Sequence, residues 1–284
     1  MDGLKNKVVV ITGGTRGLGL AIASALASEG AAVVIASRSQ KSVDEAVQQL
    51  RASGGRAEGM ALDVASLEQV EALAAFAVQR FGRIDVWVNN AGTAGPYGPT
   101  LGLAPRDFTR VVETNILGVY YGSQVAMRAF LPQHSGKLIN ILGHGYNGPV
   151  PWQNAYASSK AWVRSFTQSL AEETRGSGVG IFAFNPGMVL TDLLTNVDVV
   201  KGSEERLKNF GTVVRMWAKP PEVPAQKVAW IASSATDGKT GQLINIFSPW
   251  GMLTGAVREG VRALFKRPAG GPDIELHSID PYQQ

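Results

Sequence analysis

The 284-residue chain contains no cysteine. This absence excludes a disulfide framework, a zinc site with thiolate ligands and a cysteine nucleophile. Histidine is also scarce, and the three that are present, His134, His144 and His277, lie far apart in the sequence. We therefore expect no metal site.

The chain is also poor in charge and lacks long apolar runs. Charged residues make up 18% and hydrophobic residues 45%, which is typical of a globular protein and not of a disordered one. Because no run of about 18 residues is apolar enough to cross a bilayer and no secretion signal precedes the first strand, we expect a soluble cytoplasmic protein. The net charge of +4 is spread without a block of one sign, so we expect no nucleic-acid partner.

Glycine is the residue in excess. The chain has 33 glycines, whereas the usual frequency of roughly 7% predicts about 20. They follow no fixed period and form no low-complexity tract, so we expect them to mark places where a side chain would obstruct something.

Short apolar segments alternate along the chain with longer segments of helical period. We expect strands at residues 8–11, 32–36, 59–62, 86–89, 138–142, 180–185 and 243–247, and helices at 18–28, 43–52, 67–81, 107–130, 155–174 and 222–234. Continuous apolar strands indicate burial on both faces of a sheet, and strand–helix alternation favours parallel strands with right-handed crossovers. The predicted fold class is α/β, a single Rossmann-type domain with a doubly wound parallel sheet of about seven strands and helices on both faces.

Two segments stand outside this alternation. Residues 191–221 are predicted to form an inserted helical flap within a main domain of residues 1–250, and residues 251–284 a C-terminal extension. In the extension, Leu253, Val257, Val261 and Leu264 recur at helical spacing over residues 252–266. Such an amphipathic helix packs on the domain or on a neighbouring subunit, or alternatively makes peripheral contact with a membrane surface.

A glycine-rich segment, TGGTRGLG from Thr12 to Gly19, follows the first predicted strand and opens the first helix. Glycines let the backbone approach a pyrophosphate, and a helix N-terminus supplies free N–H groups and the positive end of its dipole. The order of strand, loop and helix predicts a dinucleotide site. Its expected contacts are Gly13, Thr15, Arg16, Gly17, Leu18 and Gly19.

Five further motifs follow in order: Asp63-Val64, Asn89-Asn90-Ala91-Gly92, Asn115-Ile116-Leu117-Gly118, Tyr156-Ala157-Ser158-Ser159-Lys160 and Pro186-Gly187-Met188-Val189-Leu190-Thr191. With the glycine loop, they resemble the short-chain dehydrogenase/reductase family over about residues 5–247. The resemblance implies that Asp63 binds the adenine, that residues 89–92 wall the cofactor channel, and that Val189 and Thr191 hold the carboxamide and the pyrophosphate. The implied cofactor contacts after the loop are Asp63, Val64, Asn89, Ala91, Gly92, Tyr156, Lys160, Pro186, Gly187, Val189 and Thr191.

The end of the second predicted strand bears on the choice of cofactor. An acidic residue there would bind the ribose 2′-hydroxyl of NAD, whereas arginine would pair with the 2′-phosphate of NADP. The chain has Ser37 and Arg38 at this point and no carboxylate, and Arg16 adds a second guanidinium. We predict NADP(H), the alternative being that both arginines only face solvent.

Tyr156 and Lys160 lie four residues apart on a predicted helix and so share one face. An ammonium beside a phenol lowers the phenol pKa, and the phenol can then exchange a proton with a carbonyl oxygen while a nicotinamide exchanges hydride with its carbon. The resemblance implies that Lys160 also reaches the nicotinamide ribose and that Asn115 holds a water in the proton relay. The predicted function is interconversion of a carbonyl and an alcohol.

One residue departs from the family pattern. A serine that binds the substrate carbonyl is expected thirteen residues before the tyrosine, and Gly143 stands there instead. Three explanations stay open. Another donor takes its place, or glycine makes room for a large substrate, or the protein is a cofactor-binding sensor or scaffold without turnover. The candidate donors are His144, Tyr146, Asn147 and Asn154.

The serine-free stretch at residues 140–145, with the segments 185–194 and 245–250, resembles the chlorophyll b reductase branch of the family. That branch uses NADPH to reduce a formyl group on a chlorin ring, so the resemblance implies a bulky apolar small-molecule substrate. The expected substrate contacts are Gly143, His144, Tyr146, Asn147, Met188, Leu193 and Leu194. Other apolar flap residues either serve the substrate or pack onto the domain, namely Val197, Val199, Val200, Phe210, Met216 and Trp217. The family resemblance also implies a homodimer or homotetramer.

Overall fold

The computed structural model describes residues 3–246, 249–265 and 273–283. Seven parallel strands form its central sheet in the order β3-β2-β1-β4-β5-β6-β8. The strands are β1 Val8–Thr12, β2 Ala32–Ser37, β3 Arg56–Ala61, β4 Val86–Asn89, β5 Gly136–Ile141, β6 Val179–Asn185 and β8 Gln242–Asn245. The predicted fold class is confirmed.

Helices cover both faces of this sheet. Neighbouring residues of β1 point to opposite faces, so Val9 and Ile11 belong to one apolar cluster and Val10 to another. The first cluster includes residues of α1 Gly17–Ser28, α2 Gln40–Ala52 and α9 Glu222–Ala232. The second includes residues of α3 Leu67–Phe81, α5 Gly118–Gln133 and α6 Asn154–Glu173. The continuous apolar strands in the sequence are thus buried on both sides.

The order of strands reverses beside β1, which lies between β2 and β4. In open parallel sheets, ligands bind at the carboxyl ends of the strands where this reversal occurs. The glycine loop leaves β1 at that edge, and the segment from Asn90 leaves β4 beside it. The topology therefore places the candidate residues at one edge of the sheet.

The helix predicted over residues 107–130 is confirmed as a helical stretch but contains a π turn that the sequence analysis did not predict. The chain forms α4 Pro105–Val112, a π-helical turn Glu113–Leu117 and then α5. A π turn inserts one residue into the helical repeat, which the spacing of apolar residues does not reveal. The π turn matters for the candidate site because it carries Asn115, whose side chain is fully buried.

The predicted helical flap at residues 191–221 is helical only in part. The flap contains α7 Asp192–Thr195, a strand β7 Asn196–Val200, a short 3₁₀ turn at Glu204–Leu207 and α8 Phe210–Trp217. Its two ends are joined, because Lys219 N donates to Met188 O (3.0 Å) and Leu190 N donates to Lys219 O (2.9 Å). The chain therefore leaves the carboxyl edge of the sheet, forms the flap and returns to a point beside the one where it left.

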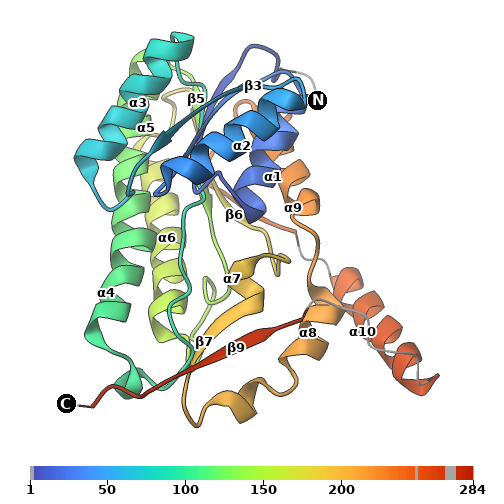
Figure 1. The fold of residues 1–284 in the computed structure, drawn as a ribbon. Coiled ribbons are helices and arrows are strands. Elements are labelled where there is room, and N and C mark those ends of the chain that lie inside the picture. The colour runs from blue at the N-terminus through green and yellow to red at the C-terminus, as the bar shows by residue number, and fades with distance from the viewer. Residues whose placement is uncertain (1–2, 247–248, 266–272, 284) are drawn as a thin grey trace.

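The C-terminal extension packs on the flap of the same chain. Helix α10 Pro249–Leu264 lies against α8, and β9 Glu275–Ile279 pairs in parallel with β7 (Figure 1). The predicted strand end at Phe247 and the predicted helix end at Lys266 lie outside the described residues, as does Ser248. Across the described ranges, no helix combines the length and the apolar character needed to cross a membrane.

Candidate active site

The glycine loop makes a tight turn between β1 and α1 and leaves the first backbone amides of α1 without a side-chain cap. A Cβ atom at Gly19 would lie 2.0 Å from Gly13 O, so the turn requires glycine there. No side chain caps the first amides of α1, whereas Ser39 caps α2 and Ser66 caps α3. A helix start with uncapped amides has its N–H groups available for an anion. The loop therefore fits the pyrophosphate of a dinucleotide.

Thr12 and Asn90 join this loop to the segment that follows β4. Asn90 Nδ2 donates to Thr12 O and to Gly13 O, each at 3.0 Å. In return, Thr12 Oγ1 accepts from Asn90 N (3.1 Å) and Ala91 N (3.2 Å). The sequence analysis placed Asn90 only within the wall of the cofactor channel and gave Thr12 no role of its own. The position of Asn90 within the Asn-Asn-Ala-Gly motif was the available signal.

Two expected cofactor residues turn their side chains into the core. Asn89 is 2% exposed, accepts from Trp87 Nε1 (2.8 Å) and donates to Asn140 Oδ1 (2.8 Å). Val64 is buried against Gly118. Any contact that these two make with a cofactor must come from the backbone.

The other expected contacts lie near the carboxyl edge of the sheet. Arg38 is exposed directly after β2, and Asp63 is exposed after β3 with its Oδ1 accepting from Ala65 N (3.0 Å). Gly187 follows Pro186 in a turn in which its N–H donates to Asn185 Oδ1 (3.2 Å). The side chains of three further expected contacts are half-buried, namely Thr15, Leu18 and Ser37.

The three predicted catalytic residues come together. Gly92 shows this, because a Cβ atom on it would lie 3.4 Å from Asn115 Oδ1 and 3.7 Å from Lys160 Nζ. Asn115 Nδ2 donates to Ser159 Oγ (3.0 Å), which lies between Tyr156 and Lys160 on α6. The π turn and the start of α6 therefore face one another across Gly92.

Burial dominates the electrostatics of the tyrosine and the lysine. It raises the pKa of Tyr156 to about 12 and lowers the pKa of Lys160 to about 8, because a low-dielectric surrounding disfavours the charged form of each group. The predicted lowering of the Tyr156 pKa by Lys160 is not found in this structure. Lys160 Nζ donates instead to Ile141 O (3.1 Å) and lies 5.6 Å from the centre of the Tyr156 ring.

Removing the buried charge is expected to stabilise the protein. Below about pH 8, Lys160 is protonated in both states and the native state bears the desolvation cost, which falls as the pH rises from about 8 to about 10. We expect Lys160→Met to increase the free energy of unfolding at pH 7 by on the order of 2 kcal/mol, after an offset of roughly 1 kcal/mol for the lost hydrogen bond.

Thermal unfolding of wild type and Lys160→Met between pH 6 and pH 10 measures this effect, with the exposed Lys208→Met as control. The variant should also lose the increase in stability from about pH 8 to about pH 10. An unfolding midpoint for Lys160→Met below that of wild type at pH 7 contradicts the expectation.

The tyrosine hydroxyl occupies the space beside Gly143. A Cβ atom at Gly143 would lie 2.1 Å from the Tyr156 hydroxyl oxygen, which is closer than any non-bonded contact allows. Glycine at this position is therefore required by the observed side-chain position of Tyr156. The space next to Gly143 holds the tyrosine and not an open volume for substrate.

Three of the four candidate replacements for the serine are bonded elsewhere. Tyr146 donates to Asn245 Oδ1 (3.0 Å), Asn147 accepts from Arg164, and Asn154 donates to Thr100 Oγ1 (3.2 Å). The fourth, His144, is exposed directly after Gly143. Asn147 and Asn154 are exposed as well, but of the four only His144 makes no side-chain hydrogen bond to the part of the chain that the structure describes.

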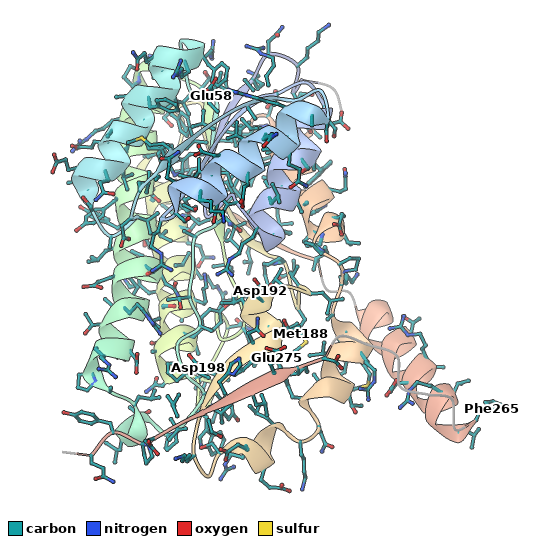
Figure 2. The ribbon with its side chains drawn as sticks, viewed as in Figure 1. Glu58, Met188, Asp192, Asp198, Phe265 and Glu275 are labelled. Carbon is teal, nitrogen blue, oxygen red and sulfur yellow. The ribbon has the colours of Figure 1, made fainter. Side chains whose placement is uncertain are left out.

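The flap begins over the glycine loop. A Cβ atom at Gly17 would lie 2.9 Å from the methyl group of Thr191, and Arg16 Nη1 lies 2.8 Å from Asp192 Oδ2. Figure 2 shows Met188 and Asp192 in this part of the molecule. The sequence analysis included Asp192 in the segment 185–194 but gave it no role.

The expected substrate side chains of the flap are open to different degrees. Leu193 is 48% exposed, and Met188 and Leu194 are half-buried. Val199 and Val200 are fully buried and pack into the protein. The remaining expected apolar flap residues are half-buried, namely Val197 in β7 and Phe210, Met216 and Trp217 in α8.

The comparison with protein families matches residues 7–200 to the short chain dehydrogenase family. This range includes the glycine loop, Asn115, Tyr156 and Lys160. The chain belongs to the short-chain dehydrogenase family. It is therefore an NAD(P)-dependent oxidoreductase that interconverts carbonyl and alcohol groups.

Curated members of the family include bacterial and plant relatives. A putative ketoacyl reductase of Streptomyces coelicolor is 33% identical over 251 residues, with 85% of this chain and 95% of that protein covered. A probable chloroplastic chlorophyll(ide) b reductase of Arabidopsis thaliana is 37% identical over 215 residues. That alignment covers 69% of this chain and 43% of the plant protein, so the chain spans less than half of its length.

Solved structures of ketoreductases share the fold. Actinorhodin polyketide ketoreductase with NADPH superimposes with a TM-score of 0.78 at 30% identity, covering 88% of this chain and 99% of the other. A 3-ketoacyl-(acyl-carrier-protein) reductase from Brucella melitensis, complexed with NADH, has a TM-score of 0.77 at 27% identity, covering 86% and 98%. Both known structures hold a nicotinamide cofactor.

Proposed function

We propose that this short-chain dehydrogenase is an NADP(H)-dependent reductase of bulky apolar aldehydes or ketones, or works in the reverse direction on the alcohols. The observation that carries the cofactor choice is the exposed Arg38 directly after β2, where no carboxylate follows the strand, together with the exposed Arg16 of the glycine loop after β1. In this structure the Arg16 guanidinium pairs with the Asp192 carboxylate (2.8 Å), and a 2′-phosphate would take the place of that carboxylate. Residues 1–250 would form the catalytic unit, with residues 251–284 attached to its flap.

Replacing both arginines is expected to separate the two cofactors. In Arg16→Ala/Arg38→Ala, the affinity for NADPH should fall by about 100-fold, because two charge-assisted contacts to the 2′-phosphate are lost. NADH lacks that phosphate, so its affinity should change by less than about threefold. Fluorescence titration of the reduced cofactors measures both dissociation constants.

Arg175→Ala serves as the matched control, because Arg175 is also exposed and lies just beyond the far end of α6. It should leave both affinities unchanged. Equal losses for NADPH and NADH in the double variant would refute the assignment of the 2′-phosphate site.

The residues around Gly92 have separate roles in the reduction of the carbonyl group. When bound, the nicotinamide supplies the hydride. Tyr156 donates the proton to the substrate oxygen, and Asn115 holds the π turn and α6 in place through Thr93 and Ser159. We assign to the charge of Lys160 the stabilisation of the phenolate that results, which requires its ammonium to turn from Ile141 O toward the tyrosine oxygen. His144 is the donor that we assign to the substrate oxygen in place of the absent serine.

The open apolar group at the start of the flap supports a bulky apolar substrate. Met188, Leu193 and Leu194 are all partly exposed on the segment that closes off the carboxyl edge of the sheet. A panel of small and bulky aldehydes and ketones with NADPH, followed at the nicotinamide absorbance band, tests this choice. Equal catalytic efficiency for small and bulky members would exclude apolar bulk as the basis of selection.

A tetrapyrrole formyl group is the second candidate substrate. The similarity to the Arabidopsis protein favours it, as does Gly143 in place of serine. A formyl chlorin therefore belongs in the same panel. Cofactor binding without turnover of any member, unchanged in Tyr156→Phe, would instead favour a sensor or scaffold.

Assembly into a homodimer or homotetramer stays a prediction, which analytical ultracentrifugation tests.

A further inference from the structure

Strand β7 of the flap is held along both edges by distant parts of the chain. On one edge, Tyr97 N donates to Asp198 O (2.8 Å) and Val200 N donates to Tyr97 O (2.9 Å). On the other edge, β9 pairs with β7 in parallel from Asn196 and Glu275 onward. The loop after β4, the flap and the C-terminal tail are therefore joined in one small layer.

Contacts beyond the paired strands continue this attachment. Lys201 N donates to Ile279 O (2.9 Å), and Lys201 Nζ lies 2.6 Å from Asp280 Oδ1. Ser278 Oγ donates to Glu204 Oε1 at 2.7 Å. The tail thus contacts the flap through its backbone and through an ion pair at the end of β9.

The same layer contacts the other loops at the carboxyl edge of the sheet. Gly98 N donates to Trp152 O (2.9 Å), and the Arg206 guanidinium of the flap lies 3.9 Å from the centre of the Trp152 ring. Tyr282 N donates to Gly102 O at 3.0 Å. The loops after β4 and β5 are therefore connected to the flap and the tail.

Close packing explains why the position of β7 is sensitive to its support. A Cβ atom at Gly98 would lie 2.4 Å from Val200 Cγ2, so the flap approaches the loop after β4 as closely as glycine permits. The side chains of β9 itself remain mostly open, with Leu276 39% exposed. Strand β9 therefore buries little apolar surface of its own, and its main effect is to cover the edge of β7.

We propose that β9 is a strap that holds the flap in the position from which it encloses a bulky substrate. Figure 2 shows Glu275 and Asp198 on the two paired strands, with Met188 and Asp192 at the start of the flap above them in the view. Asn196, the first residue of β7, directly follows α7 and pairs with Glu275. The strap thus acts on the segment that carries Leu193 and Leu194. The substrate part of this proposal rests on the function proposed above.

Deleting residues 273–284 tests the strap, with hydrogen exchange resolved to single amides. The informative amides are those of Tyr97 and Val200, because their acceptors, Asp198 O and Tyr97 O, remain in the truncated chain. If β9 holds the flap, their exchange should quicken by about tenfold or more. Unchanged exchange at both amides overturns the strap.

Kinetics of the truncated enzyme test the role in substrate selection. The KM for a bulky apolar aldehyde should rise by roughly fivefold or more, while the KM for a small aldehyde and the dissociation constant of NADPH stay within about twofold. Faster exchange with an unchanged KM for the bulky aldehyde overturns selection by the strap. A wild-type enzyme that reduces no carbonyl overturns the proposed function, while the exchange measurement still decides whether β9 holds the flap.

A charge reversal repeats the test in the full-length chain, should the truncated protein fail to fold. Lys201→Glu places a carboxylate against Asp280, whereas the control Lys208→Glu faces Glu205 within its own turn. Lys201→Glu should quicken exchange at Val200 by roughly threefold, and adding Asp280→Lys should restore it. Equal effects of the two reversals, or no rescue by Asp280→Lys, contradict the strap.

Discussion

Gly143→Ala is expected to lower kcat by about 100-fold or more, because a displacement of the reacting group by about 1 Å has an effect of this size. The added Cβ atom would lie 2.1 Å from the Tyr156 hydroxyl oxygen, so the tyrosine must leave its observed position. The same argument applies to Gly143→Ser. Restoring the serine expected in the family should therefore lower activity on small and large substrates alike. Steady-state kinetics with both substrate sizes measure this.

Gly148→Ala is the matched control for this prediction. Gly148 lies in the same loop after β5, and a Cβ atom there would meet nothing within 4 Å. Its activity should equal that of wild type. A Gly143→Ala enzyme with wild-type kcat would show that Tyr156 acts from a position other than the one observed.

Tyr156→Phe is expected to lower kcat/KM by about 10²- to 10⁴-fold, the usual contribution of a positioned general acid. Phenylalanine keeps the ring and removes the hydroxyl, so NADPH affinity and thermal stability should stay close to wild type. Tyr146→Phe is the control, because its hydroxyl bonds to Asn245 on the surface. Retained turnover in Tyr156→Phe would exclude the hydroxyl as the proton donor.

The pH dependence follows from the same two groups. Burial raises the pKa of Tyr156 to about 12, so its hydroxyl carries the proton needed for reduction throughout the assay range. The pKa of Lys160, lowered by burial to about 8, sets the alkaline limit, because an uncharged amine no longer stabilises the phenolate. We expect kcat/KM for reduction to fall as the pH rises through about 8. A profile that stays level to pH 10 contradicts this role of Lys160.

Local sequence determined the scaffold and most of the candidate site. The seven strands of the sheet all appear where continuous apolar segments predict them, within a few residues at their ends. The spacing of Tyr156 and Lys160 on one helix, and of the glycines around Arg16, was readable for the same reason. Strand burial, helical period and tight turns all depend on residues that are close together in the chain.

Local patterns could not reveal the elements that depend on distant partners. Residues 196–200 form a strand because Tyr97 and β9 supply its hydrogen bonds, and nothing in their own sequence indicates where those partners lie. The π turn at Asn115 is invisible for a different reason, since one inserted residue leaves the apolar spacing almost unchanged.

The meaning of Gly143 was likewise decided by the tertiary structure. By itself, the sequence showed that a side chain is missing where the family has a serine, and it left open what uses the space. The fold brings the hydroxyl of Tyr156, thirteen positions further along the chain, into that space. Sequence determined which groups are present, whereas the packing of loops from separate strands decided which of them touch, because such contacts depend on three-dimensional distance and not on spacing along the chain.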